Sequence, residues 1–205
     1  MKAPTMKGSS PRIAEKSRES SETTVTVKVN IDGKGEFNIT TKVPFFTHLL
    51  QMIAKHGKID LDVTADGDLD HHVIEDATME LAGAIKEALG DMKGIQRFGF
   101  AYVPMDESLA RCVVDLSGRP YYVGDLKMQG LDIEGMKVED IEHFMLTFAQ
   151  NLKANVHVEV LYGENDHHKV EAATKALALA LRMAMKIDTS LAGIIPSTKG
   201  KLDTE

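Results

Sequence analysis

His71-His72-Val73-Ile74-Glu75 and His167-His168-Lys169-Val170-Glu171 are two copies of one pattern, His-His-x-x-Glu, in a chain of 205 residues. An Asp stands directly before each copy, and a Gly stands four residues before each first His. With the eight His of this chain, roughly 0.02 chance matches to the pattern are expected. Two copies therefore indicate that the fold is organised around them.

The spacing around the two copies indicates an internal repeat. His48 precedes His71 by 23 residues, and His143 precedes His167 by 24. Each half contains strand patterns, a helix, a strand, a turn and a second helix, in that order. We therefore predict an α+β fold of two duplicated half-units, each an antiparallel sheet covered on one face by two helices. The predicted parts are a flexible tail at 1–11, a first half at 12–94, a second half at 95–190 packed on the first as one pseudo-two-fold domain, and a C-terminal tail at 191–205.

The first half shows how the elements follow from the residues. Val alternates with polar residues across 23–31, a Gly-containing turn follows, and 37–43 continues as a return strand, so we predict a hairpin of these two strands. Pro44 opens a predicted helix that ends near Gly57. A longer helix is predicted to start at Asp70, which acts as its N-cap.

The repeated pattern suits metal binding. Residues i and i+4 share one face of a helix, so each first His points the same way as its Glu, while the second His projects about 100° away and is free to serve another ion. The upstream His of each half supplies a third imidazole to that half. The candidate ligands are His48, His71, His72, Glu75, His143, His167, His168 and Glu171.

Mixed imidazole and carboxylate ligands suit a first-row divalent ion, and the lack of Cys ligands speaks against structural zinc. An octahedral site with room for water suits Mn(II), although affinity alone favours later metals. Asp70 and Asp166 are predicted as helix N-caps, as acceptors that orient a ligand His, or as both. Asp76 is predicted to be a solvated or capping carboxylate.

Composition excludes several classes of function. The net charge is −7 with no basic block, so general nucleic-acid or membrane-surface binding is not expected. The N-terminal residues lack the apolar stretch of a secretory signal, and the lone Cys112 has no partner for an intrachain disulfide. We expect a cytoplasmic protein in which Cys112 is an inert core thiol.

Basic residues in turns indicate an anionic ligand. Arg97, Arg119 and Lys199 lie in turns marked by Gly or Pro, and Lys175 lies one helical turn beyond Glu171. Side chains and backbone N–H groups of such turns can hold a phosphate. On an acidic protein these residues predict a small anionic substrate.

From about Arg12 to Leu202 the chain resembles the imidazoleglycerol-phosphate dehydratases of histidine biosynthesis. The resemblance is carried by PFFTHLL, HGKIDLDV, DHHVIEDA, KGIQRFG, VPMDESL, DLSGRPY, EHF, GENDHHKVEA and IPSTKG. It implies half-units similar to the second domain of ribosomal protein S5. It also implies dehydration of imidazole glycerol phosphate to imidazole acetol phosphate, a reaction in which two Mn(II) ions act as Lewis acids and hold the substrate as an imidazolate.

The resemblance further implies a homo-oligomer of about 24 chains, with the two metal sites between subunits. All eight candidate ligands become metal ligands, and His72, His168, Glu22 and Glu171 become catalytic. Glu22 is the candidate for moving the proton, and Glu171 is the alternative. The implied substrate contacts are Glu22, His56, Arg97, Arg119, Lys175, Ser197, Thr198 and Lys199.

Some positions depart from the family pattern. Thr47 stands where the family usually has Asp before the first ligand His, and the loop before His71 is shorter than usual. Gln51, Met52 and Val73 also differ, while every ligand position is filled. Two other functions stay open: a two-metal hydrolase or phosphatase on the same scaffold, and a non-enzymatic RNA-binding module, which the acidic charge disfavours. The sequence leaves open which His binds which ion.

Overall fold

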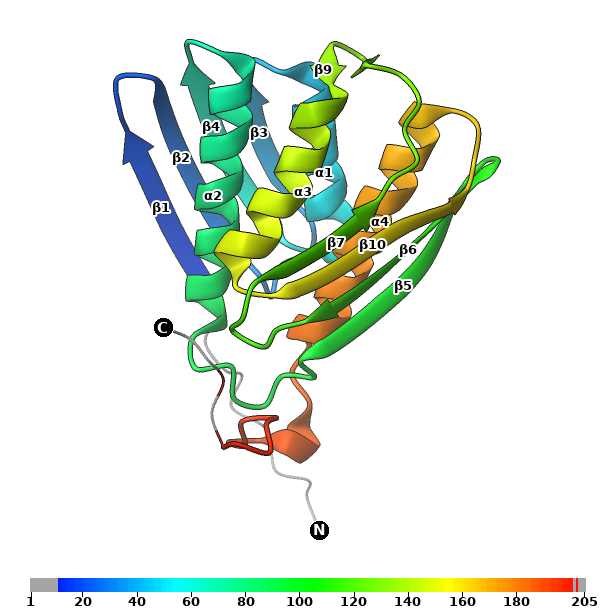
Figure 1. Ribbon diagram of the computed structural model, residues 1–205. Helices are drawn as coiled ribbons and strands as arrows, with labels where there is room; N and C mark the ends of the chain where they lie inside the picture. The colour runs from blue at the N-terminus through cyan, green and yellow to red at the C-terminus, as the bar shows by residue number, and fades with distance from the viewer. Residues whose placement is uncertain (1–10, 201, 203–205) are drawn as a thin grey trace.

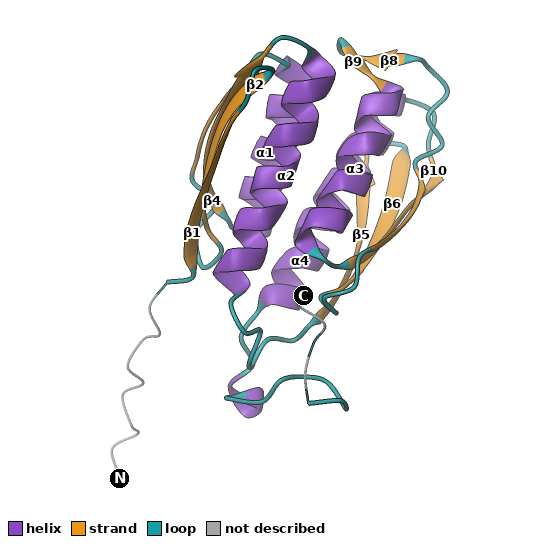
Figure 2. Cartoon of the chain, turned by 60° about the vertical axis from the view of Figure 1, so that its left-hand side comes forward, coloured by secondary structure: helices purple, strands orange, loops and turns teal. Residues whose placement is uncertain are grey.

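Two four-stranded sheets enclose four α-helices in this computed structural model, which describes residues 11–200 and 202. Figure 2 shows the helices as the inner layers and one sheet on each outer side. The predicted tail at 1–11 lies outside the described residues except for residue 11. The two sheets have the same topology, so the α+β fold with two half-units, each a mainly antiparallel sheet with two helices, is confirmed.

The first sheet has the strand order β1-β2-β4-β3. Its strands are β1 (Ile13–Glu19), β2 (Thr23–Asn30), β3 (Phe37–Thr41) and β4 (Asp60–Gly67). β2 pairs antiparallel with β1 and β4, whereas β3 pairs parallel with β4.

The predicted hairpin of 23–31 with 37–43 is therefore wrong. The backbone N–H groups of Lys34, Gly35 and Glu36 donate to Oδ1 of Asp60 at 2.7, 3.0 and 3.1 Å. These bonds fix the turn after β2 against the start of β4, so the chain crosses to the far side of β4. The hairpin partner of β2 is instead β1, whose charged edge-strand sequence shows little alternation.

The second sheet repeats this order as β5-β6-β10-β7. Its strands are β5 (Phe98–Met105), β6 (Ser108–Asp115), β7 (Tyr121–Asp125) and β10 (Asn155–Tyr162), with β7 parallel to β10. The segment 127–137, between β7 and α3, contains a short hairpin of β8 (Asp132–Ile133) and β9 (Met136–Lys137).

The four helices bring the two halves together. They are α1 (Pro44–Gly57), α2 (Asp70–Leu89), α3 (Val138–Leu152) and α4 (Asp166–Met185). α1 packs against α4, and α2 packs against α3, so each helix contacts a helix of the other half. Phe46 and Phe144 meet edge to face at 5.6 Å between ring centroids in this shared interior.

The predicted Asp N-caps are wrong by one residue. Asp70 is the first residue of α2, whose N-cap is Leu69, and Asp70 lies 3.4 Å from Lys42. Asn165 is the N-cap of α4 and accepts from the backbone N–H of His168 at 3.3 Å. Asp166 lies inside the helix, and its carboxylate accepts hydrogen bonds from other groups, which are described below.

The core follows the sequence pattern. The Val residues at 25, 27 and 29 of β2 are buried, as their alternation predicts. Cys112 is a buried free thiol on β6, and burial raises its pKa to about 12. Among the residues that the structure describes, no helix has both the length and the apolar character needed to cross a membrane.

Candidate metal centres

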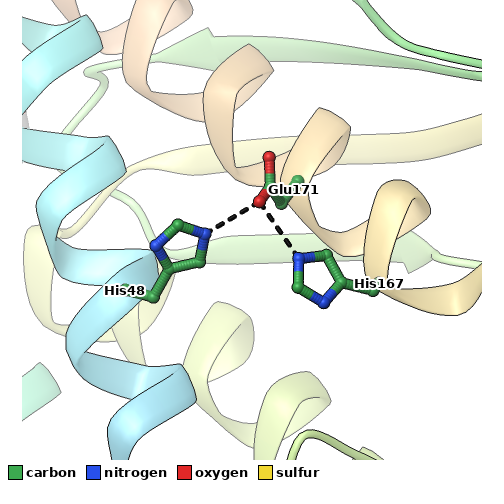
Figure 3. Close-up of side chains that lie close together, drawn as sticks. All are labelled: His48, His167 and Glu171. Atoms are coloured by element: carbon green, nitrogen blue, oxygen red, sulfur yellow. Dashed lines mark hydrogen bonds and ion pairs between the residues drawn. The ribbon is translucent and has the colours of Figure 1, made fainter.

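The first group of converging ligands is the His167 cluster, formed by His48, His167 and Glu171. Nε2 of His48 lies 2.8 Å from Oε1 of Glu171, and Nε2 of His167 lies 3.1 Å from the same oxygen. The three ligand atoms are all within 4.8 Å of one another. Figure 3 shows the imidazole rings of His48 and His167 turned toward the Glu171 carboxylate. His48 lies on α1, whereas His167 and Glu171 lie on α4.

The second group is the His71 cluster, formed by His71, Glu75 and His143, whose ligand atoms also lie within 4.8 Å of one another. Nε2 of His143 lies 3.2 Å from Oε1 of Glu75. The two groups are not aligned for a hydrogen bond, so this buried nitrogen has no hydrogen-bond partner among the described residues. A buried imidazole nitrogen that lies close to a carboxylate oxygen without a hydrogen bond fits a metal ligand set.

Both clusters are formed across the two halves. His48 of the first half joins His167 and Glu171 of the second, while His143 of the second half joins His71 and Glu75 of the first. The expectation that each upstream His serves its own half is therefore wrong. The reason is the pairing of α1 with α4 and of α2 with α3.

His72 and His168 are not brought into either cluster. Nδ1 of His72 lies 2.8 Å from Oδ1 of Asp68, and Nδ1 of His168 lies 2.7 Å from Oε2 of Glu107. The hydrogen bond to the neighbouring carboxylate raises the pKa of each His. Both side chains are partly exposed, so each is accessible to a second molecule.

Carboxylates that the sequence analysis did not identify hold the first His of each pattern. Nδ1 of His71 lies 2.6 Å from Oδ1 of Asp140, and Nδ1 of His167 lies 3.3 Å from Oε1 of Glu134. A signal for Asp140 existed, because it precedes His143 by three residues and so shares its helix face. Glu134 lies in the β8–β9 turn, which no sequence pattern connects to the site.

Asp70 and Asp166 do not orient the ligands as predicted. Oδ2 of Asp166 accepts from the backbone N–H groups of Gln129 and Gly130 at 2.8 Å each. Its other oxygen lies 2.8 Å from Nζ of the buried Lys169, which also donates to the carbonyl of Lys127 at 2.9 Å. Asp166 and Lys169 therefore fasten the segment before β8 to the start of α4.

Glu171 is the most strongly perturbed carboxylate of the clusters. Burial alone would raise its pKa, but hydrogen bonds from Lys175, His48 and His167 together lower it to about 2. Nζ of Lys175 lies 2.5 Å from Oε2 of Glu171. Glu171 is therefore ionised at neutral pH, and so acidic a group is a weak proton acceptor.

Glu22 lies in the turn between β1 and β2, with its Oε2 4.0 Å from Nδ1 of His72. The predicted solvation of Asp76 is wrong, because this carboxylate is buried. It accepts from Oγ1 of Thr23 at 2.5 Å and pairs with Arg18 at 2.9 Å. Asp76 thereby anchors the turn that carries Glu22 to α2, the helix that also carries His72.

The basic turn residues lie far from both clusters. Arg97 binds Asp115 through Nε and Nη2 at 2.7 and 3.0 Å, and donates from Nη1 to the carbonyl of Pro196 at 2.7 Å. Its backbone N–H bonds to Ala184 near the end of α4. His167 is near the start of that helix, so a rise of 1.5 Å per residue places Arg97 roughly 25 Å from His167. Figure 1 shows α2 and α4 starting at the top and the C-terminal segment at the bottom.

The other predicted substrate contacts divide between the two ends. Ser197, Thr198 and Lys199 belong to the C-terminal segment that Arg97 holds. Arg119 follows Ser117 in the turn before β7, and its carbonyl accepts from Asn155 at the start of β10. Lys175 and His56, by contrast, lie near the His167 cluster, where burial and then Lys175 lower the pKa of His56.

A family model described as imidazoleglycerol-phosphate dehydratase matches residues 41–181. The imidazoleglycerol-phosphate dehydratase of Zymomonas mobilis subsp. mobilis is 47% identical over 194 residues, which cover 93% of this chain and 99% of that protein. The one of Dehalococcoides mccartyi is 47% identical over 192 residues, which cover 94% and 98%.

Two crystal structures are similar to this fold. Imidazoleglycerol-phosphate dehydratase from Staphylococcus aureus superposes with a TM-score of 0.79 at 33% identity, covering 86% of this chain and 99% of that chain. The enzyme from Pyrococcus furiosus, in complex with (S)-C348, gives a TM-score of 0.80 at 35% identity, covering 91% and 100%.

Proposed function

This chain belongs to the imidazoleglycerol-phosphate dehydratase family and is a hydro-lyase of histidine biosynthesis, and we propose that it works with two Mn(II) ions per chain, one at each cluster. The observation that carries the proposal is the convergence of two His and one Glu in each cluster, with the His143 nitrogen buried and without a hydrogen bond among the described residues. When bound, the two ions supply Lewis acids for the nitrogens of the substrate imidazole.

The chain completes each site only with other copies of itself. Arg97, which is proposed to hold the phosphate, lies roughly 25 Å along α4 from the His167 cluster of the same chain, too far for both to contact one small substrate. The described part of the C-terminal segment is held to Arg97 through the Pro196 carbonyl and lies at the same end. His72 and His168 point out of the clusters and supply the missing ligands to neighbouring copies. We propose a closed assembly of about 24 chains, with every site shared between subunits.

The side chains then divide the work. Arg97, Arg119, Ser197, Thr198 and Lys199 hold the phosphate of the substrate, where guanidinium groups and turn N–H groups match its oxygens. Lys175 and His56 border the His167 cluster and face the bound ring. The carbon next to the ring loses its hydroxyl, and Glu22, in the anchored turn near His72, accepts the proton from the following carbon, so that one water is eliminated and an enol remains. As the enol becomes the ketone, its hydroxyl proton is lost and a proton is returned to the carbon next to the ring.

Glu171 is a ligand in this scheme and not the base, because its pKa is too low for it to accept a proton readily. The buried, unpaired Cys112 suits a reducing compartment, and a cytoplasmic location is part of the proposal.

The test is metal content together with product analysis. Purified protein is expected to hold about two Mn per chain and to convert imidazole glycerol phosphate to imidazole acetol phosphate. Glu22→Gln is expected to lower kcat by 100-fold or more, an effect typical of removing a general base, while metal content stays at the wild-type value. Release of inorganic phosphate without the dehydrated product would identify a phosphatase instead, and protein that never binds metal would refute the proposed centres.

A further inference from the structure

The two clusters occupy equivalent positions of the repeat but have different neighbours. The residue three places before the upstream His is Phe45 in the first half and Asp140 in the second. The residue four places after the cluster Glu is Met79 in the first half and Lys175 in the second. Both differences concern charged groups in direct contact with a cluster residue.

Asp140 holds His71 in one orientation. Its carboxylate is 4% exposed, lies on α3 beside His143, and contacts Nδ1 of His71 at 2.6 Å. With Nδ1 held, Nε2 is the nitrogen left to bind an ion. A carboxylate behind a ligand His fixes the tautomer and ring orientation and strengthens the metal bond.

The His167 cluster has a weaker support in the same place. Phe45 occupies the position of Asp140 and packs on His167 at 5.1 Å between ring centroids. The carboxylate behind His167 comes from Glu134, at 3.3 Å, on a side chain that is 63% exposed. Its β-turn position and exposure give it more freedom than the buried Asp140 has on a helix.

Lys175 places a positive charge against the His167 cluster. Its Nζ lies 2.5 Å from Oε2 of Glu171, whose Oε1 is the oxygen shared by the two His. The pair is largely buried, so charges interact more strongly there than across water. A divalent cation bound at this cluster would be repelled by Lys175, whereas Glu75 has the neutral Met79 in the equivalent position.

We propose that the two metal centres differ in affinity: the His71 cluster binds its ion more tightly, with Asp140 as a positioning residue, and the His167 cluster binds and releases its ion more readily. The inference rests on the proposed function, because it takes both clusters to be metal centres. The inference adds to that function the order in which the two clusters bind their ions.

Metal-stripped full-length protein is titrated with Mn(II), followed by the EPR signal of the free ion and by calorimetry. Wild-type protein is expected to bind in two distinguishable steps. Loss of the tighter step in His143→Ala and of the weaker step in His48→Ala assigns the steps to the clusters.

Three variants test the cause. Asp140→Asn is expected to weaken the tighter step by about 10- to 100-fold, the usual effect of losing a carboxylate behind a ligand His. Lys175→Met, which copies the first half, is expected to strengthen the weaker step by about tenfold, since a buried repulsion is removed. Glu134→Gln is the matched control, and because the Glu134 side chain is itself exposed, a change of less than about threefold is expected in either step.

Two steps of equal affinity in wild-type protein would overturn the inference while leaving the proposed function intact. If no Mn(II) binds at all, both the inference and the proposed function are refuted. A difference in affinity between the two steps that neither Asp140→Asn nor Lys175→Met reduces also overturns the inference. If Asp140→Asn fails to fold, as judged by circular dichroism, Lys175→Met decides the outcome alone.

Discussion

The Asp60 carboxylate determines, as a single residue, where the chain goes after β2. It accepts three backbone N–H groups from the turn at 34–36 and a fourth bond from the side chain of Asn30 at 3.2 Å. Partial burial alone would raise its pKa, but these hydrogen bonds outweigh burial and lower it. The sequence marked this turn by its Gly residues, but no local pattern showed that a residue 26 positions after Lys34 would hold it.

Asp60→Asn is expected to lower the free energy of unfolding by about 1.5–3 kcal/mol at pH 7, since bonds to a charged acceptor become bonds to a neutral one. Because the folded-state pKa lies below the unfolded value, the wild-type advantage is present above about pH 4 and is lost as pH falls through the folded-state pKa. Urea unfolding of metal-stripped wild type and variant, at one chain concentration and several pH values, measures both. A difference that stays constant down to pH 2 would contradict this explanation.

At the scale of elements, the sequence predicted the four helices well because their Pro, Gly and apolar-periodicity signals are local. The strand pairing failed where it depended on contacts between distant segments, as in β2 with β1 and β3 with β4. Close packing between elements was equally hidden. A Cβ on Gly99 of β5 would clash with the backbone carbonyl of Ala180 and lie 2.8 Å from the backbone nitrogen of Ala184, so β5 lies directly on α4.

Gly99→Ala is expected to destabilise the protein by about 1–3 kcal/mol or more, because the contact is with helix backbone that has little room to move. Gly83→Ala, in the middle of α2, is the matched control. The added Cβ would lie 3.2 Å from the flexible Lys16 side chain, so the better helix propensity of Ala is expected to stabilise by about 0.5–1 kcal/mol. Thermal unfolding of both variants measures the shifts, and equal shifts of the same sign would refute the packing argument.

At the scale of the whole molecule, the sequence picked out the His and Glu residues that converge in the two clusters but not their grouping. The repeat matched His48 with His143, yet each of them joins the cluster residues of the opposite half, because α1 packs on α4 and α2 on α3. No local spacing in the sequence indicates this packing between halves. His72 and His168 are adjacent to cluster residues in sequence and outside the clusters in space. Their proposed use by neighbouring copies links metal binding to assembly.

His72→Ala and His168→Ala are therefore expected to lose both bound metal and the large assembly, while each chain keeps its secondary structure. Sedimentation velocity together with metal analysis measures the two losses, and circular dichroism checks the fold. His157→Ala, on the outer face of β10 and remote from both clusters, is the control and is expected to change neither quantity. A variant of His72 or His168 that retains its metal and full assembly would show that the exposed His pair has no such role.

The formation of each cluster from helices of both halves also has a consequence for descent. A half-length ancestor would have carried every ligand type on one short chain, yet it could have built a cluster only by pairing with a second copy of itself. Such a dimer would have had two identical clusters, because both copies came from one gene. Fusion of the copies removed that constraint, and the two halves then diverged at two positions beside the clusters. One position holds Phe45 in the first half and Asp140 in the second, and the other holds Met79 in the first half and Lys175 in the second.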